Sequence, residues 1–238
     1  LEFGEAEKKH IRRKIHYYLD HDTYQKFILG ISSEGKNEYV HEFTVNFPRG
    51  KFVLDFQPFS EIKISYFKTI HGFTNTYGIV LGLTHDGTAT TRTIGYTSDT
   101  KYFGKLGSYF KKVDVVIANI SEITLDDLKK TGYKESHMGY HGCFDLANHD
   151  EVYPELFILS EFWGGKGDIR KIISEYLQYE IWERRKDVYI LPGDLNLHID
   201  LGENKIKCSD CQNFFDKKEI EVKNSDGENS DLHYLCPE

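Results

Sequence analysis

The stretch that decides the fold is KTIHGFTNTYGIVLGL, residues 68–83, followed by TIGYTSDT, residues 93–100. Each stretch contains a short run of residues that favour β-strands, and each run has a polar side chain at a turn of small residues. His71 comes just before the first run, and Asp99 comes just after the second. Imidazole and carboxylate groups both bind divalent cations, and strand ends commonly supply them. The two side chains are therefore predicted to be metal ligands that lie close together.

Length and composition indicate a folded protein with a sizeable core. The chain has 238 residues, of which 39% are hydrophobic and 14% aromatic, and this is enough apolar material to exclude global disorder. Its 30 Lys and Arg residues against 38 Asp and Glu residues give a net charge of −8, which argues against a general nucleic-acid coat. The sequence has no apolar run of about eighteen residues and no charged-then-apolar leader. We therefore expect a soluble, cytoplasmic protein with no membrane partner.

The apolar pattern divides the chain into three parts. Residues 5–31 show a mostly helical spacing and are predicted to form a helix. A meander of strands follows, with a hairpin turn at 48–50; its predicted strands are residues 42–47, 51–56, 61–67, 77–83 and 90–96. After Asp99 strands and helices alternate, with strands at 113–120, 156–159, 188–191 and 195–201 and helices at 124–130 and 167–183. The predicted fold class is α/β, with a main domain over residues 1–204 and a small one over residues 205–238.

Two later segments carry side chains suited to chemistry. Residues 136–142 place His137 and His141 among glycines, which predicts an irregular loop that brings a histidine over a substrate as a general acid. A surface loop with incidental histidines is the other interpretation. Glu161 follows a buried strand and precedes a glycine-rich turn, a position at which α/β proteins place binding residues. Its other interpretation is a simple helix-entry loop.

Three of the four cysteines lie close together near the end of the sequence: Cys208, Cys211 and Cys236. This distribution suits a structural zinc site better than a disulfide framework. The Cys-x-x-Cys pair and the Cys-Pro-Glu segment resemble the two knuckles of a zinc ribbon, which has four tetrahedral ligands. A cysteine directly after Glu238 is the expected fourth ligand, and His233 is the only other candidate nearby.

In order along the chain, these segments resemble the C-terminal half to two-thirds of a metallo-β-lactamase-fold hydrolase of the ribonuclease Z-like and phosphodiesterase branches. The resemblance covers roughly residues 60–201. It implies an αββα sandwich, incomplete in this chain, and a metal-dependent hydrolase or nuclease that acts on phosphodiester bonds of a nucleotide or nucleic acid. In the implied mechanism Asp99 bridges two zinc or manganese ions, His71 and Glu161 hold one each, and His137 protonates the leaving oxygen. Glu161 stands where the family has a histidine, and the tail adds one structural zinc.

The main signature of that family, His-x-His-x-Asp-His, is absent from the chain. Two explanations are open: the chain is a fragment whose missing N-terminal part carries the signature, or it is a degenerate member without catalysis. We favour the fragment, because the chain opens on a predicted helix with no preceding strand and the second zinc knuckle lacks its last ligand. The rival functions are a non-catalytic binding scaffold of the same fold and one half of a split hydrolase that a partner chain completes.

Overall fold

The computed structural model describes residues 14–18, 42–46, 51–56, 59–72, 75–85, 90–121, 123–129, 134–162, 167–185, 187–194, 196–203, 205–224 and 232–237. The chain divides into two compact units, Leu1–Phe52 and Val53–Glu238. Within the described ranges, no helix combines the length and the apolar character needed to cross a membrane.

In the first unit, β1 (Lys14–Tyr18) and β2 (Glu42–Asn46) form a two-stranded parallel sheet. The helix predicted over residues 5–31 is therefore wrong at β1, and the rest of that range lies outside the described residues. The KIHYY sequence of β1 is rich in residue types that favour strands, and helical spacing over so short a segment does not exclude a strand. The hairpin turn predicted at 48–50 lies outside the described residues, and the next described strand is β3 (Lys51–Phe56).

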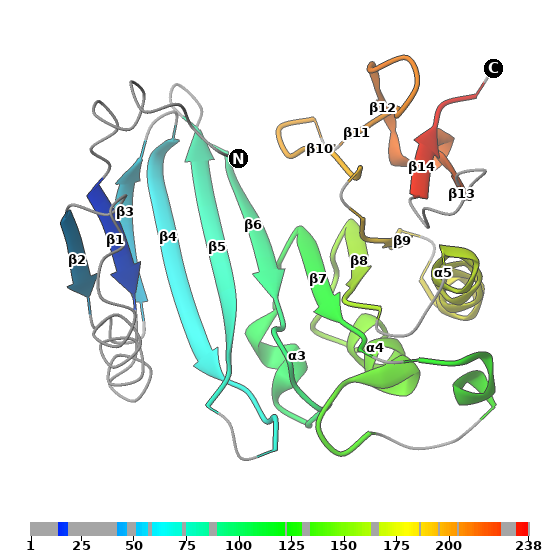
Figure 1. Ribbon diagram of the computed structural model, residues 1–238, viewed down its shortest axis with the longest axis horizontal. Coiled ribbons are helices and arrows are strands. Elements are labelled where there is room, and N and C mark those ends of the chain that lie inside the picture. Colours follow the sequence, from blue (N-terminus) through cyan, green and yellow to red (C-terminus); the bar gives the residue numbers. More distant parts are fainter. Residues whose placement is uncertain are drawn as a thin grey trace, which may run out of the picture. The chain divides into compact units, whose positions relative to one another are not determined.

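The second unit is built on a seven-stranded sheet with the strand order β3-β4-β5-β6-β7-β8-β9 (Figure 1). The strands after β3 are β4 (Phe59–Lys68), β5 (Tyr77–His85), β6 (Thr91–Tyr96), β7 (Val115–Asn119), β8 (Leu156–Ser160) and β9 (Tyr189–Pro192). Neighbours from β4 to β6 are antiparallel, and neighbours from β6 to β9 are parallel. The predicted change from a meander to an alternating pattern after Asp99 is confirmed, and the fold class is mixed α/β.

Helical segments cover one face of the parallel strands. They are α3 (Leu106–Tyr109), the 3-10 turn η1 (Leu125–Leu128), α4 (Gly139–Ala147) and α5 (Gly167–Trp182). Phe157 and Leu159 of β8 pack among these helices, whereas Leu156 and Ile158 belong to a second core cluster, because successive strand residues point to opposite faces. Burial on both faces explains the continuous apolar run of β8. The described residues thus supply one helical layer and one large sheet of the expected αββα arrangement.

The tail, described over residues 205–224 and 232–237, contributes to that second core cluster. It contains β11 (Lys205–Lys207), β12 (Phe214–Asp216), the turn η2 (Lys217–Glu219), β13 (Glu221–Asn224) and β14 (Leu232–Leu235). β11 pairs with β12 and with β10 (Ile199–Asp200), which is the described strand within the predicted range 195–201, and β13 pairs with β14. Ile206, Leu232 and Tyr234 are fully buried in the cluster with Leu156 and Leu191. The domain boundary at residue 204 stays a prediction.

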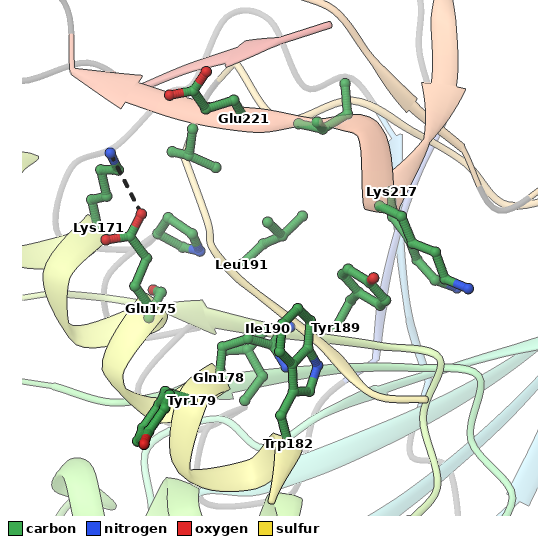
Figure 2. A pocket seen from close by; sticks show the side chains of 15 residues that line it. Lys171, Glu175, Gln178, Tyr179, Trp182, Tyr189, Ile190, Leu191, Lys217 and Glu221 are labelled. Atoms are coloured by element: carbon green, nitrogen blue, oxygen red, sulfur yellow. Dashed lines mark hydrogen bonds and ion pairs between the residues drawn. The ribbon is translucent and has the colours of Figure 1, made fainter. Parts of the chain in front are cut away.

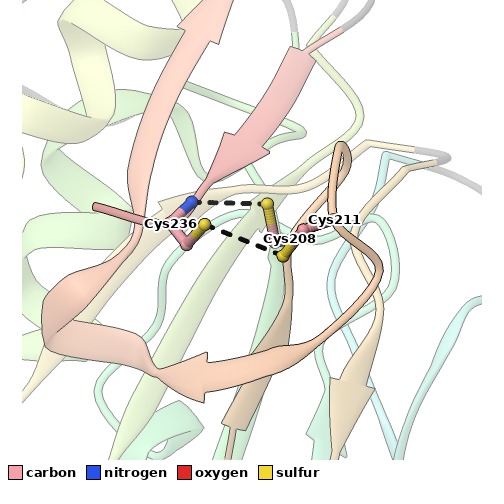
Figure 3. A group of neighbouring side chains, drawn as sticks. All are labelled: Cys208, Cys211 and Cys236. Atoms are coloured by element: carbon pink, nitrogen blue, oxygen red, sulfur yellow. Dashed lines mark hydrogen bonds between the residues drawn. The ribbon is translucent and has the colours of Figure 1, made fainter. Parts of the chain in front are cut away.

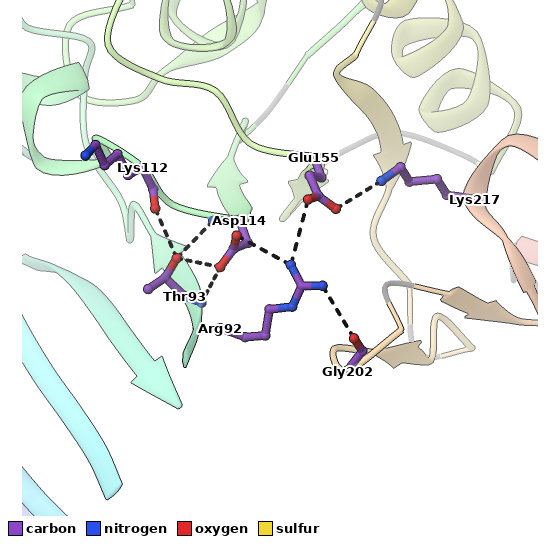
Figure 4. A network of polar contacts seen from close by, with 7 residues as sticks. All are labelled: Arg92, Thr93, Lys112, Asp114, Glu155, Gly202 and Lys217. Carbon is purple, nitrogen blue, oxygen red and sulfur yellow. Dashed lines mark hydrogen bonds and ion pairs between the residues drawn. The ribbon is translucent and has the colours of Figure 1, made fainter. Parts of the chain in front are cut away.

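Polar contacts also join the tail to the sheet. Arg92 lies 3.6 Å from the Asp114 carboxylate and 3.7 Å from the Glu155 carboxylate, and it donates to the carbonyl of Gly202 at 3.4 Å (Figure 4). Lys217 approaches Glu155 at 3.4 Å. Partly exposed pairs of this kind contribute about 0–1 kcal/mol each. Burial of apolar tail residues therefore holds the tail in place more than these ion pairs do.

Asp194, in the loop after β9, also connects the tail to the main sheet and its helices. Its Oδ2 accepts hydrogen bonds from the guanidinium of Arg170 on α5 at 2.9 Å and from the backbone N–H of Leu232 at 2.8 Å. The two charged side chains are only 13% and 8% exposed, so removal of either partner leaves the other charge poorly solvated. This contact fixes α5, the loop after β9 and β14 to one another.

Candidate metal centre at the carboxyl edge of the sheet

Consecutive strands of the sheet end at one edge. The parallel strands β6, β7 and β8 place their carboxyl ends side by side. Just beyond these ends, Ser98, Ser121 and Glu161 have φ angles of 56°, 74° and 55°, in the left-handed region that residues other than glycine seldom adopt. Each such turn costs about 1–3 kcal/mol, and strained backbone of this kind is concentrated at functional sites. The three turns redirect the chain sharply after each strand and place polar side chains at this edge.

His71, Asp99 and His137 meet at this edge. One ligand atom of each side chain lies within 4.8 Å of the others, and all three residues are partly buried. The Nε2 atoms of the two histidines are 3.1 Å apart. The structure thus brings together two residues that were predicted as metal ligands and one that was predicted as a general acid.

The loops that carry His71 and Asp99 are bound to each other through backbone and threonine contacts. The N–H of Lys101 donates to the carbonyl of Ile70 at 2.8 Å, and the N–H of Ile70 donates to Oγ1 of Thr100 at 3.1 Å. Oγ1 of Thr69 donates to the carbonyl of Asp99 at 3.2 Å. Thr69 and Thr100 are both buried. The positions of His71 and Asp99 are therefore fixed before any ligand binds.

Asn119 is a site residue that the sequence analysis missed. It is 2% exposed at the end of β7, and its amide nitrogen donates to the hydroxyl of Tyr96 at 3.0 Å and to Oδ1 of Asp99 at 3.4 Å. Its Oδ1 accepts from Oγ of Ser160 at 2.7 Å. The available signal was a polar residue inside the otherwise apolar run 115–120, because such a residue needs a specific partner when buried.

Glu161 lies beside the cluster and not within it. Its carboxyl group lies close enough to the Asp99 and Asn119 side chains for both to influence its pKa. The residue as a whole is exposed, but desolvation of its carboxyl group, followed by the Asp99 charge, raises its pKa. Two carboxyl groups in contact require a proton or a cation between them. The donor types and their contact therefore fit a divalent cation.

His137 lies two residues before the start of α4, and its environment favours the neutral ring. Oγ of Ser136 is 3.1 Å from its Nδ1. Desolvation, followed by the nearby His71, lowers the pKa of His137; Lys134 also lowers it, and Asp99 opposes the shift. A neutral imidazole binds a metal or accepts a proton, and it is a poor acid at neutral pH.

The irregular loop predicted over residues 136–142 is wrong from Gly139 onward, because α4 begins there and contains His141. Gly142 serves the packing of this helix: a Cβ at this position would lie 3.1 Å from Cβ of Tyr102, so the missing side chain permits close approach. His141 packs edge-on against Tyr140 and is not among the clustered ligand atoms.

The tail cysteines form a second group. Ligand atoms of Cys208, Cys211 and Cys236 lie within 4.8 Å of one another, whereas Cys143 is fully buried in the helical core cluster.

A groove of about 390 Å³ lies between α5, β9 and the tail, and it shares no lining residue with the His71 cluster or with the cysteine cluster (Figure 2). The candidate metal centre therefore lies at the carboxyl ends of the strands, and the groove is a separate feature of the molecule.

Comparison with known proteins gives one sequence relative and several distant structural ones. No protein-family model matches the chain. The uncharacterized protein MJ1374 of Methanocaldococcus jannaschii is 31% identical over 114 residues, which are 48% of this chain and 38% of that protein. The chain thus spans less than two-fifths of the length of this curated relative.

Three solved structures show a likeness at low identity. The metallo-β-lactamase fold protein YhfI from Bacillus subtilis is 17% identical, with a TM-score of 0.49 over 77% of this chain and 61% of that chain. A diphosphatase from the PhnP family is 9% identical, with a TM-score of 0.48 over 79% and 60%. Zinc-bound PqqB from Methylobacterium extorquens is 11% identical, with a TM-score of 0.46 over 77% and 64%.

Proposed function

We propose that this chain carries the metal centre of a hydrolase that cleaves phosphodiester bonds in a nucleotide or nucleic acid. The observation that supports the proposal most is the convergence of His71, Asp99 and His137 at the carboxyl edge of the sheet. Active sites of open α/β sheets occupy this edge. The order of His71 and Asp99 also follows the pattern of the family that the sequence resembles.

A divalent cation, zinc or manganese, would be held by His71, Asp99 and His137, and Glu161, which lies next to Asp99, would be a ligand to a second cation. When bound, such a cation supplies hydroxide at neutral pH and polarises a phosphoryl oxygen. His137 takes the role of a ligand in this proposal, because its Nε2 lies 3.1 Å from that of His71 and its pKa is lowered. The general-acid role expected of His137 from the sequence stays a prediction beside this ligand role.

The remaining groups position the site and attract the substrate. Asn119 orients Asp99 and Glu161 through its amide, as buried partners of metal ligands commonly do. Lys134 lies close enough to lower the pKa of His137, so it adds positive charge beside the cluster. Positive charge at this place favours an anionic substrate such as a phosphodiester.

The proposal is tested by turnover of bis(p-nitrophenyl) phosphate after metal removal and reloading with Zn²⁺ or Mn²⁺. Asp99→Asn is expected to lower kcat at least about 100-fold, equivalent to about 3 kcal/mol of transition-state stabilisation. Asp126→Asn, which changes an exposed carboxylate of η1, is the matched control and should leave kcat unchanged. Equal activity of wild type and Asp99→Asn would contradict the site assignment.

A second candidate is a non-catalytic metal-binding scaffold, or one half of a split hydrolase that a partner chain or a further segment completes. Two observations favour it: the clustered donors among the described residues number three, and the sequence contains no His-x-His-x-Asp-His signature. Metal bound at Asp99 without turnover of the phosphodiester would select this candidate. Recovery of turnover only after adding a second, by itself inactive polypeptide that carries the His-x-His-x-Asp-His signature would select the split hydrolase.

A further inference from the structure

The three tail cysteines converge from two separate sheets. Cys208 directly follows β11 and is 1% exposed, whereas Cys236 directly follows β14. Cys211 is exposed, and its Sγ lies 3.8 Å from Sγ of Cys236. Figure 3 shows the three thiols turned toward one another. The cluster therefore joins the β10-β11-β12 sheet to the β13-β14 sheet.

Backbone groups prepare the cluster for a negative charge. The N–H of Cys236 donates to Sγ of Cys208 at 3.4 Å. Hydrogen bonds to the ionised form of a group favour that form, and the thiolate is the form of cysteine that binds metals.

The turn that carries the first two cysteines is folded independently of the thiols. The N–H of Gln212 donates to the carbonyl of Cys208 at 3.2 Å, and Gln212 has a φ of 62°. Ser209 pairs with Tyr234 on β14: its N–H donates to the Tyr234 carbonyl at 2.7 Å, and its Oγ accepts from the Tyr234 N–H at 2.9 Å. The geometry around the thiols is thus preformed by backbone contacts.

We propose that Cys208, Cys211 and Cys236 bind one thiophilic divalent cation, Zn²⁺ by its ligand preference, and that this cation clasps β14 to the turn after β11. Three thiolates within reach of one ion form a zinc-type ligand set, since soft sulfur ligands select zinc over magnesium, calcium or manganese. His233, the fourth ligand considered from the sequence, is not among the clustered ligand atoms; its Nδ1 lies 4.0 Å from Asp210.

The clasp stabilises the tail where it covers the sheet. Leu232 and Tyr234 of β14 are fully buried in the second core cluster, and the hydroxyl of Tyr234 donates to the carbonyl of Pro192. The tail also forms one wall of the groove beside α5, to which it contributes Lys217, Ile220 and Val222 (Figure 2). Loss of the cation is therefore expected to loosen the packing of β13 and β14 on the sheet and, with it, this wall of the groove.

Cobalt substitution tests the site separately from the candidate hydrolytic centre. Metal-free protein is titrated with Co²⁺, and the thiolate-to-cobalt charge-transfer band in the near ultraviolet is recorded. The band is expected in wild type and in His71→Ala, because the histidine and carboxylate ligands of that centre contribute no thiolate. It should be lost in Cys211→Ser and retained in Cys143→Ala, which removes the buried cysteine outside the cluster.

Two results would overturn the metal site. The first is a band of equal strength in wild type and Cys211→Ser. The second is absence of the band together with an intact mass that shows a Cys211–Cys236 disulfide in the freshly purified protein. Failure of the hydrolase proposal alone would leave the band unchanged, so the two proposals fail separately.

Hydrogen exchange tests the clasp. Removal of Zn²⁺ by a chelator is expected to speed exchange in β13 and β14 and to leave β4 and β5 unchanged, because these two strands contribute no residue to the core cluster that contains the tail. The Cys211→Ser variant should show the fast exchange with or without chelator. Unchanged exchange of β14 after removal of zinc would show that the cation does not hold the tail.

Discussion

The Nε2 atoms of His71 and His137 lie 3.1 Å apart, although 66 residues separate the two histidines in the sequence. With an oxygen of Asp99 in the same group, the side chains supply the imidazole and carboxylate donors that divalent cations bind in hydrolytic sites. The loops that carry His71 and Asp99 are fixed by buried threonines, and Asn119 fixes the carboxylate. The site is therefore organised by protein contacts alone.

Replacement of Asn119 by alanine should weaken cation binding at the cluster by about 10- to 100-fold, the usual effect of losing a buried partner of a metal ligand. Asn119 is 2% exposed, and its amide orients Asp99 through a hydrogen bond to Oδ1. Titration with Mn²⁺ measures the affinity, since the tail thiolates prefer softer metals. Ser108→Ala, which removes an exposed hydroxyl on α3, is the control, and equal affinities in the two variants would refute a positioning role.

Removal of the buried Arg185 guanidinium should lower the free energy of unfolding substantially. It is 9% exposed, and its guanidinium donates to four carbonyls at the end of α4 and beyond: Ala147, Asn148, His149 and Val152. Arg185→Leu removes all four of these hydrogen bonds, of which only the His149 carbonyl is known to keep another donor, the N–H of Val152, and is expected to lower the free energy of unfolding by about 3 kcal/mol. Urea unfolding measures the change. The neighbouring, exposed Arg184→Leu should cost less than about 0.5 kcal/mol, and a similar loss in both variants would contradict this account.

Gly95 in β6 is required for packing. A Cβ at this position would lie 2.4 Å from the ring of Phe110, and Phe110 is fully buried. Gly95→Ala is expected to lower the free energy of unfolding by about 1–3 kcal/mol through overpacking. Gly104→Ala, where nothing lies within 4 Å of the new Cβ, is the control and should be nearly neutral in thermal unfolding. A neutral Gly95→Ala would show that α3 does not pack on β6 as described.

Several features were predictable from the sequence because they depend on local pattern. Strands β4 to β9 follow from their β-prone runs, and Thr124 caps η1 with Asp127 as its partner, as the N-cap pattern indicates. Glu161 was recognised as a strand-end carboxylate. Its position near Asp99 could not be predicted, because it depends on the order of β6, β7 and β8 in the sheet, and the pairing of distant strands is not encoded locally.

Other features required the three-dimensional arrangement. Asn119 ends an apolar run, and nothing in the sequence indicates which side chains its amide meets. The position of His137 at the cluster depends on how α4 packs, and the glycines of that segment suggested a loop instead of a helix. The burial of Tyr234 against the sheet could not be predicted either, because the tail and the sheet share no repeating pattern.

Cys143 should stay unreactive in the native protein. Burial raises the pKa of its thiol above the usual value of 9.0, so the reactive thiolate is scarce. A disulfide reagent added to metal-free protein should modify the tail cysteines quickly and Cys143 only upon unfolding. Because the folded pKa is raised, the stabilising effect is complete below the unfolded value and is lost as the pH rises above about 9.

Cys143→Ala removes this dependence on pH, so the free energy of unfolding of wild type and variant should converge as the pH rises from about 8 to 10. A constant difference between them, or rapid labelling of Cys143 in the native protein, would contradict the burial of this thiol.

The most direct test of the metal centre is the metal content of purified wild type and Asp99→Ala, measured by mass spectrometry after reloading with zinc. The account predicts at least one zinc per chain beyond the ion held by the tail cysteines, and loss of that excess in Asp99→Ala. Equal zinc content in the two proteins, with all of it lost in Cys211→Ser, would place the metal in the tail alone and contradict a hydrolytic centre at His71, Asp99 and His137.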